Sequence, residues 1–462
     1  MNTGVMHTAT YGVAGIVGLA VAVWILIRPQ RGVLLFAAIS PLHYILIFAL
    51  GAGFPNGWKE GLLGFTAVCA VIRTRWSAVP RFTQPWAYLF ALLAAIGIVS
   101  ALVTLPMNVA LSPIKITFFY GLVFPIIIWL RPLDAGDRDH LISIMMLLGL
   151  GTGLYGIYQQ VTGADALAAQ GFAYNTDIRF AGGLLRSFST FGQPFPFALF
   201  MMLVLLVCGS VAAAQPRRPR NLVFLVLTPI YLVAMSTAVV RAAFLGLLIG
   251  LLWIGFHRYR KLLTALGIGA IVAAAVTAVF SGPVLSTFLS SNSLGERGTG
   301  WSDSITSILG HPFGIGLGTT GSAAEVVAKA TRSSSAPYQP DNYYIKVAIE
   351  LGPLALWVFV GVLVVAVLHT VRASRAATDP VDRNLCVGVS AAAVAVAAAA
   401  LVSTYFEIFP DDAYFWLLLG AAASTVVAPR RDTTNGDIGA EGPHDADAAP
   451  VDAVPDPTTL VR

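Results

Sequence analysis

Three arginines stand apart from the short basic clusters that occur elsewhere in the chain. Arg186 precedes one apolar run, Arg241 begins another, and Arg297 lies in a long polar segment. A guanidinium group offers paired donors in a fixed geometry that matches phosphate oxygens, and an arginine beside apolar segments is costly without an anionic partner. These positions indicate that the three side chains converge on a phosphate-bearing ligand. The alternative is that each arginine reaches lipid headgroups or pairs with a carboxylate, for which the candidates are Glu296, Asp303 and Glu350.

The pair Asp341-Asn342 is a second candidate, because it follows Pro340 and precedes a long apolar run. An aspartate at a membrane surface can act as a general base, which takes a proton from a hydroxyl group of a substrate. Aspartate is also a favoured N-cap, and a helix N-terminus attracts anionic groups. We therefore expect Asp341 to act as a base or orienting residue, as a helix cap, or as both.

The segment His311–Gly318 reads His-Pro-Phe-Gly-Ile-Gly-Leu-Gly and resembles a glycine-rich anion cradle. Without a preceding strand, however, a Gly-x-Gly-x-Gly pattern is an unspecific signal. A tight turn that lets the loop fold onto the helices explains the glycines better. His311 is accordingly either a substrate contact or a turn residue.

Glu407, Asp411 and Asp412 form an acidic cluster near the C-terminal end of the apolar region. Carboxylates can hold a divalent cation, but no further ligand is evident in this segment. We expect the cluster to be a solvated loop face or a carboxylate neighbour for one of the arginines. The sequence predicts no metal site and no cofactor.

The composition of the chain predicts that helices in a membrane position these residues. Hydrophobic residues make up 57% and charged residues 11% of the 462 residues, and the mean hydropathy is +0.77. The apolar runs have the length that crosses a bilayer, so a soluble enzyme is excluded, and the scattered basic clusters argue against nucleic-acid binding. The predicted spans, twelve or thirteen in number, are 11–27, 32–51, 60–72, 86–105, 114–130, 141–161, 195–214, 222–236, 238–256, 262–280, 342–370, 385–405 and 412–428.

The distribution of basic residues predicts the orientation. Alternate connections between the spans, together with the start of the C-terminal tail, hold 18 of the 28 Lys and Arg residues, which is a positive-inside bias. This bias places the N-terminus outside, the C-terminus in the cytoplasm, and the loops 162–194 and 281–340 outside. We expect residues 1–428 to form one membrane-embedded domain, and residues 429–462, which are acidic and poor in apolar residues, to form a disordered cytoplasmic tail.

Several of these segments resemble the O-antigen ligase and O-antigen polymerase superfamily of bacterial membrane glycosyltransferases. The resemblance covers mainly residues 180–360 and is carried by Arg186–Pro194, Ser236–Arg241, Arg297 with Trp301, His311–Gly318, and Asp341–Gly352. Asp341 stands where the ligases usually have histidine, which favours a polymerase-like member.

The resemblance implies an all-α polytopic fold similar to the glycosyltransferase-C enzymes, with a long extracytoplasmic loop. It implies transfer of a glycan from an undecaprenyl-diphosphate-linked donor to a glycan or lipid-linked glycan acceptor, on the outer face of the plasma membrane. Arg186, Arg241 and Asp341 would be catalytic. The residues expected to bind substrate are Gln193, Arg297, Trp301, His311, Asn342 and Tyr343. Preorganised cations would stabilise the departing diphosphate, and Asp341 would activate the acceptor hydroxyl.

Two alternatives remain open. An O-antigen-type ligase would attach finished polymer to a lipid or protein acceptor and would differ from a polymerase only in the acceptor. A flippase or other transporter of lipid-linked oligosaccharides would use the same cations, but it should show two related halves, and no internal repeat is visible in the sequence.

Overall fold

The chain is helical apart from one small hairpin in the residues described by the computed structural model, which are 3–51, 57–268, 304–332 and 337–426. Strands β1 (Arg179–Ala181) and β2 (Leu184–Arg186) pair antiparallel, with Arg179 opposite Arg186. The predicted all-α class is confirmed. The predicted tail 429–462 and the first part of the loop 281–340 lie outside the described residues.

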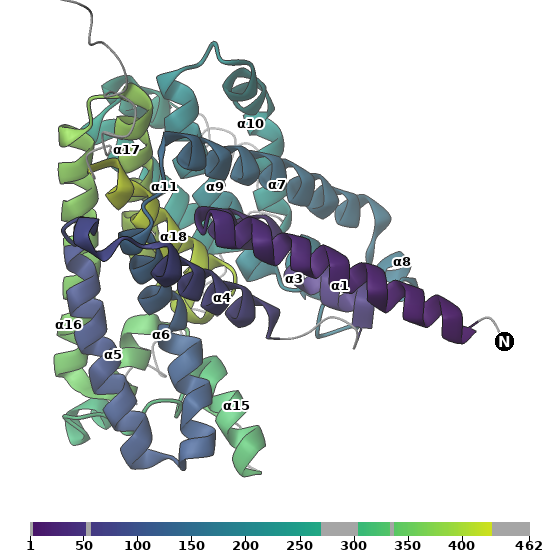
Figure 1. Ribbon diagram of the computed structural model, residues 1–462, viewed down its shortest axis with the longest axis vertical. Coiled ribbons are helices and arrows are strands. Elements are labelled where there is room, and N and C mark those ends of the chain that lie inside the picture. The colour runs from purple at the N-terminus through teal and green to yellow at the C-terminus, as the bar shows by residue number, and fades with distance from the viewer. Residues whose placement is uncertain (1–2, 52–56, 269–303, 333–336, 427–462) are drawn as a thin grey trace, which may run out of the picture. The chain divides into compact units, whose positions relative to one another are not determined.

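Figure 1 shows how the helices are arranged. They are α1 (Thr3–Ile27), α2 (Gln30–Ile39), α3 (His43–Leu50), α4 (Trp58–Arg73), α5 (Pro85–Thr104), α6 (Met107–Leu130), α7 (Ala135–Thr162), α8 (Ala164–Ala169), α9 (Pro194–Ala214), α10 (Pro219–Thr237), α11 (Arg241–His257), α15 (Gly321–Thr331), α16 (Tyr343–Ala376), α17 (Pro380–Ala399) and α18 (Asp411–Ala423). Single 3-10 turns are η1 (Ser40–Leu42), η3 (Trp76–Ala78), η4 (Ser189–Phe191), η5 (Tyr405–Glu407) and η6 (Ser424–Val426).

Eight helical segments in the described ranges are long and apolar enough to cross a membrane, so the protein is a polytopic membrane protein. The predicted span 32–51 is divided into α2 and α3 by η1, where Pro41 lacks the N–H that a continuous helix needs. The predicted spans 60–72, 238–256 and 412–428 correspond to α4, α11 and α18, which have only 16, 17 and 13 residues. Most of the predicted span 262–280 lies outside the described ranges.

Helix α9 lies at the centre of the packing, because it is apolar on every side. Its neighbours are α7, α10, α11 and α17, and 83% of its span is buried. Small residues let α17 approach closely, since Gly388 meets Val207 of α9 and Gly246 of α11 meets Ala395. Close approach through small residues is how helices associate in a membrane, where apolar contact alone gives no preference over lipid.

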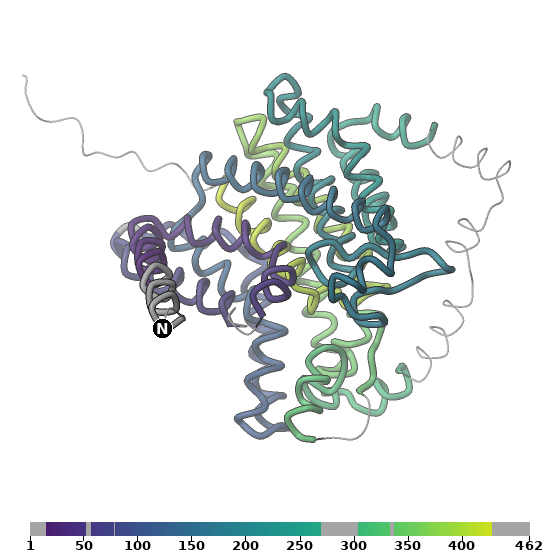
Figure 2. Tube along the Cα trace, turned by 90° about the vertical axis from the view of Figure 1, so that its right-hand side faces the viewer, coloured from purple at the N-terminus to yellow at the C-terminus, as the bar shows by residue number. Residues whose placement is uncertain are grey.

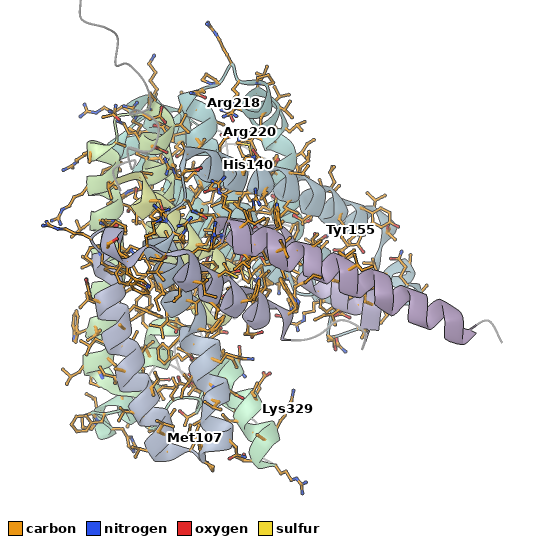
Figure 3. All side chains as sticks on the ribbon, viewed as in Figure 1. Met107, His140, Tyr155, Arg218, Arg220 and Lys329 are labelled. Atoms are coloured by element: carbon orange, nitrogen blue, oxygen red, sulfur yellow. The ribbon has the colours of Figure 1, made fainter. Side chains whose placement is uncertain are left out.

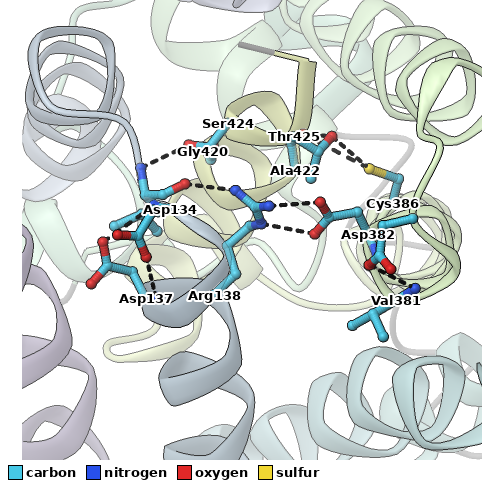
Figure 4. A network of polar contacts seen from close by, with 12 residues as sticks. Asp134, Asp137, Arg138, Val381, Asp382, Cys386, Gly420, Ala422, Ser424 and Thr425 are labelled. Atoms are coloured by element: carbon cyan, nitrogen blue, oxygen red, sulfur yellow. Dashed lines mark hydrogen bonds and ion pairs between the residues drawn. The ribbon is translucent and has the colours of Figure 1, made fainter. Parts of the chain in front are cut away.

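Connections that the sequence predicts on the cytoplasmic side do meet at one end of the helices. Arg138 donates to both oxygens of Asp382 at 2.9 and 2.6 Å, which joins α7 to α17 (Figure 4). Arg28 reaches Asp134 at 2.6 Å, and Arg218 pairs with Asp139 at 2.6 Å. Figure 3 shows Arg218 and Arg220 far from Met107 and Lys329, which lie at the opposite end.

The opposite end is formed by the turn between α5 and α6, by α15 and by the beginning of α16. Helix α15 packs against α6, and α16 packs against α5, so that residues 304–332 lie beside the α5–α6 hairpin (Figure 2). This end carries the candidate residues His311, Asp341, Asn342 and Tyr343.

Candidate functional site

Arg186 ends strand β2 and is held in a half-buried position. Its Nε donates to the carbonyl oxygen of Ala238 at 3.1 Å, and its guanidinium carbon lies 5.1 Å from the centre of the Phe195 ring. Burial, and to a lesser extent the charge of Arg179, lower the pKa of Arg186. A guanidinium group in such surroundings gains stability from an anionic ligand.

The segments that carry Arg186 and Arg241 are joined by one side chain at the end of α7. The Gln160 amide nitrogen donates to the carbonyl of Leu185 at 2.7 Å and to the carbonyl of Thr237 at 3.1 Å. The backbone N–H of Ser187 also donates to Thr237, at 2.9 Å. The structure thus brings together two of the three arginine segments, although they lie far apart in the sequence.

The neighbouring Gln159 holds the turn that follows Arg186. Its buried side chain accepts from the N–H groups of Phe188 and Ser189 at 3.1 and 2.8 Å, and it donates to the carbonyl of Ser189 at 3.3 Å. Neither glutamine was identified from the sequence, where they appear only as a polar pair ending an apolar run. A glutamine pair at a helix end beside an arginine-bearing loop is the signal that would have indicated them.

Two strained residues flank these arginines. Ser189 and Val239 have φ values of 50° and 51°, in the left-handed region, which is unusual for a residue with a side chain and more so for a β-branched one. Val239 lies two residues before Arg241, the exposed first residue of α11. Such strain concentrates at functional sites, where the surrounding structure enforces it.

The glycine-rich segment His311–Gly318 packs onto α16 through its backbone. The N–H groups of Ile315 and Gly316 donate to the carbonyls of Ile349 and Glu350 at 2.9 and 3.0 Å. Gly352 has φ 86° and breaks α16 at this point, and a side chain there would collide with the carbonyl of Pro312. The glycines therefore serve close backbone packing, and two distant sequence motifs form a single structural unit.

His311 is exposed at this turn, and its Nδ1 lies 3.0 Å from the carbonyl oxygen of Ser307. This contact places it at the end of a short helix, residues 304–310, as the turn-residue alternative expects. Arg297 and Trp301 belong to the part of the chain that the structure does not describe.

A buried charged triad lies directly beside the glycine-rich segment. Lys346 contacts Glu350 at 2.6 Å and Glu407 at 3.0 Å, and no more than 2% of any of the three side chains is exposed. Glu350 also accepts from the N–H and hydroxyl of Thr320 at 2.9 and 3.0 Å. The triad ties α16 to η5 and to the residue before α15. The spacing of Lys346 and Glu350, four residues apart at the start of an apolar helix, is the sequence signal that was missed.

The expectation of a solvated acidic face is wrong. Glu407 and Asp411 are fully buried and Asp412 is 4% exposed, because η5 and the start of α18 pack between the other helices. The charge next to Glu407 is a lysine, not an arginine, and Glu350 is likewise paired with Lys346. Burial raises the pKa of Glu407, and the charge of Lys346 opposes that rise.

The start of α16 distinguishes between Asp341 and Asn342. The Asn342 side chain is the cap, since it accepts from the N–H groups of Tyr344 and Ile345 at 2.9 and 3.1 Å. The capping role considered for Asp341 therefore belongs to its neighbour, and Asp341 is exposed. Tyr343 is 3% exposed and packs on Phe359 and Phe406, so its ring takes part in the core.

A cavity of about 310 Å³, which we call the charged cavity, lies between α3, α4, α6 and the η5–α18 segment. Its lining includes Lys59, Glu60, Lys115, Tyr120 and Asp412, together with Glu407 of the triad. In the sequence these lysines contribute only to the predicted topology. Ionisable residues inside a membrane domain are candidates for functional residues. This principle, applied to the sequence, would have indicated the two lysines.

Gln193 is exposed immediately before α9 and makes no capping hydrogen bond there. The described residues contain no group of three or more His, Cys, Asp or Glu side chains that could hold a metal ion.

Comparison with known proteins finds a similarity to one family. Residues 222–360 match the family model described as O-Antigen ligase, a region that includes Arg241, the glycine-rich segment, Asp341 and Lys346. No curated protein matches the chain in sequence. The match covers less than half of the chain, and together with the helical architecture it supports a similarity to the O-antigen ligase and polymerase superfamily.

Proposed function

We propose that the protein is a membrane glycosyltransferase that moves a glycan from undecaprenyl diphosphate to a sugar hydroxyl on the outer face of the plasma membrane. The observation that carries this proposal is the joining of the Arg186 and Arg241 segments by Gln160. Two arginines on strained, firmly held turns are suited to a diphosphate leaving group, because charge accumulates on it as the glycosidic bond breaks.

The arginines and Asp341 take different roles in this proposal. Arg186 and Arg241 stabilise the departing diphosphate, and Arg297 and Trp301, which lie outside the described residues, bind the donor. Asp341, which is exposed and is not the helix cap, accepts the proton of the attacking hydroxyl. The substitution of aspartate for the histidine usual in ligases favours a polymerase-like reaction in surface or exopolysaccharide assembly.

The test is to incubate the purified protein with a polyprenyl-diphosphate-linked oligosaccharide and to separate the products by size. A polymerase gives a ladder of products that differ by one repeat. A single adduct on an added acceptor indicates the ligase alternative. Movement of intact donor across a vesicle membrane, without formation of any new glycosidic bond, indicates a transporter and contradicts the proposal.

A further inference from the structure

The charged cavity differs from the arginine segments in its charge balance. Lys115 lies 3.2 Å from Glu60, and Glu407 is paired with Lys346 at 3.0 Å. Lys59 and Asp412 add opposite charges to the same lining. Lys346 is shared with Glu350, so these groups together have one more carboxylate than cations. Such a cavity does not attract a diphosphate, and it offers both donors and acceptors to a neutral polar ligand.

Two polar atoms of the described lining residues are buried without a hydrogen-bond partner. Among the described residues, the hydroxyl of Tyr120 and the Oε2 atom of Glu60 have no hydrogen-bond partner. The Tyr120 side chain belongs to a residue that is only 7% exposed. Buried polar groups are nearly always hydrogen-bonded, so each exception needs an explanation. A hydroxylated ligand has the chemistry that both groups lack, since a hydroxyl can donate to a carboxylate and can accept from a phenol.

Aromatic rings supply the apolar part of the lining. The Phe409 ring lies 5.8 Å from the Tyr120 ring in a stacked arrangement and 5.1 Å from the His43 ring at its edge. Lys59 Nζ lies 4.0 Å from the centre of the Phe409 ring. Ring faces combined with carboxylates and amines match a sugar, which has apolar C–H faces and hydroxyl groups at its edge. A volume of about 310 Å³ is at the lower end of ligand pockets, which range over roughly 300–1,000 Å³.

We propose that the charged cavity binds a neutral sugar ring of the acceptor glycan, separately from the arginines that hold the diphosphate of the donor. This inference rests on the proposed function, since it names the place of the second substrate. The ligand class is a neutral hydroxylated ring, held by Tyr120, Glu60, Lys59 and Asp412.

Trp58 makes the binding measurable, because its indole N–H donates to His43 Nδ1 at 2.9 Å on the cavity wall. Purified protein in detergent is titrated with methyl glycosides of glucose, galactose, rhamnose and N-acetylglucosamine while tryptophan fluorescence is recorded. We expect at least one glycoside to change the emission saturably, and the change to be lost in Trp58→Phe. Absence of saturable binding by any of them overturns the proposal, and so does displacement by inorganic pyrophosphate.

The Tyr120→Phe variant removes one hydroxyl and keeps the ring, so the fold is preserved. Loss of one hydrogen bond should weaken glycoside binding about 3- to 10-fold. The matched control is Tyr88→Phe, at a tyrosine that is 65% exposed on α5, and it should bind as the wild type does. Equal affinity of the two variants overturns the proposal.

The kinetics separate this inference from the proposed function. In the transfer reaction, Tyr120→Phe should raise the KM for the acceptor by a similar factor and leave the KM for the donor unchanged. If transfer occurs but the acceptor KM does not respond, the cavity assignment is wrong and the glycosyltransferase function stands. If glycosides bind in the cavity but no transfer occurs with any donor, the cavity assignment stands and the proposed function fails.

Discussion

Replacing Lys346 by methionine removes the cation that two buried carboxylates share. Glu350 and Glu407 then face each other without compensation, with 2% and 0% of their side chains exposed. Removing one partner of a buried ion pair costs about 3–5 kcal/mol. The pKa of Glu407 gives an independent value. If its pKa rises in the folded variant from the ordinary 4.5 to about 7, the free energy of unfolding falls by about 3.4 kcal/mol, at about 1.4 kcal/mol per pKa unit.

The loss should depend on pH in a defined direction. In Lys346→Met the folded protein holds a proton on Glu407 that the unfolded chain releases above its ordinary pKa of 4.5. Stability of the variant therefore falls as the pH rises above 4.5 and recovers as the pH is lowered, by about 1.4 kcal/mol per unit for one proton. The wild type should vary less, because Lys346 keeps Glu407 compensated.

The assay is thermal unfolding in detergent at pH 5.5, 6.5 and 7.5. We expect the Tm of Lys346→Met at pH 7.5 to fall by on the order of 5–10 °C, taking roughly 2 °C or more per kcal/mol. Lys329→Met is the matched control, because Lys329 is exposed on α15, and it should not change the Tm. The double variant Lys346→Met with Glu407→Gln should recover part of the loss, since one of the two carboxylates is removed.

Two results would refute the reasoning. One is a Tm of Lys346→Met equal to that of Lys329→Met, which would mean that the triad contributes nothing to stability. The other is a large loss that is the same at every pH, which would point to lost packing and not to uncompensated charge.

Three further predictions concern transfer itself, measured with a lipid-linked donor after folding has been checked by size exclusion. Arg186→Ala and Arg241→Ala should each lower turnover by at least about 100-fold, which is the effect of removing a hydrogen-bond donor to the transition state. Full activity of either variant would mean that the arginine only orients the protein in the membrane. Asp341→Asn should abolish turnover and leave the helix cap intact, because Asn342 is the cap; undiminished activity excludes Asp341 as the base. Gln160→Leu removes the hydrogen bonds that join the two arginine segments and should lower both Tm and turnover, by about 1 kcal/mol of stability per bond, whereas Gln170→Leu, at an exposed glutamine, should change neither.

The resemblance of the sequence to the family was informative about motifs but not about what each motif contacts. The glycines of His311–Gly318 and the break at Gly352 appear in the sequence as separate features. The structure shows that the first packs its backbone against the second, with Gly316 N–H bonded to Glu350. Spacing along the chain cannot reveal this contact, because the intervening residues turn back on themselves.

The boundaries of the spans were less predictable than their existence. Apolar runs identified most helices, but the break at Pro41 and the short length of α18 depend on how each segment packs. The hydropathy of an apolar run indicates how favourable its free energy of transfer into lipid is. It does not report whether the helix crosses the bilayer or ends within the protein.

The sequence by itself determined that this is a helical membrane protein, and it named Arg186, Arg241 and Asp341 as residues able to do glycan-transfer chemistry. Only the tertiary structure decided which charges meet. It paired Glu407 with Lys346, buried an acidic cluster that was expected to face solvent, and joined two arginine segments through hydrogen bonds of Gln160. The reason is physical: hydropathy is a sum over neighbours along the chain, whereas a charge interacts according to its distance in space.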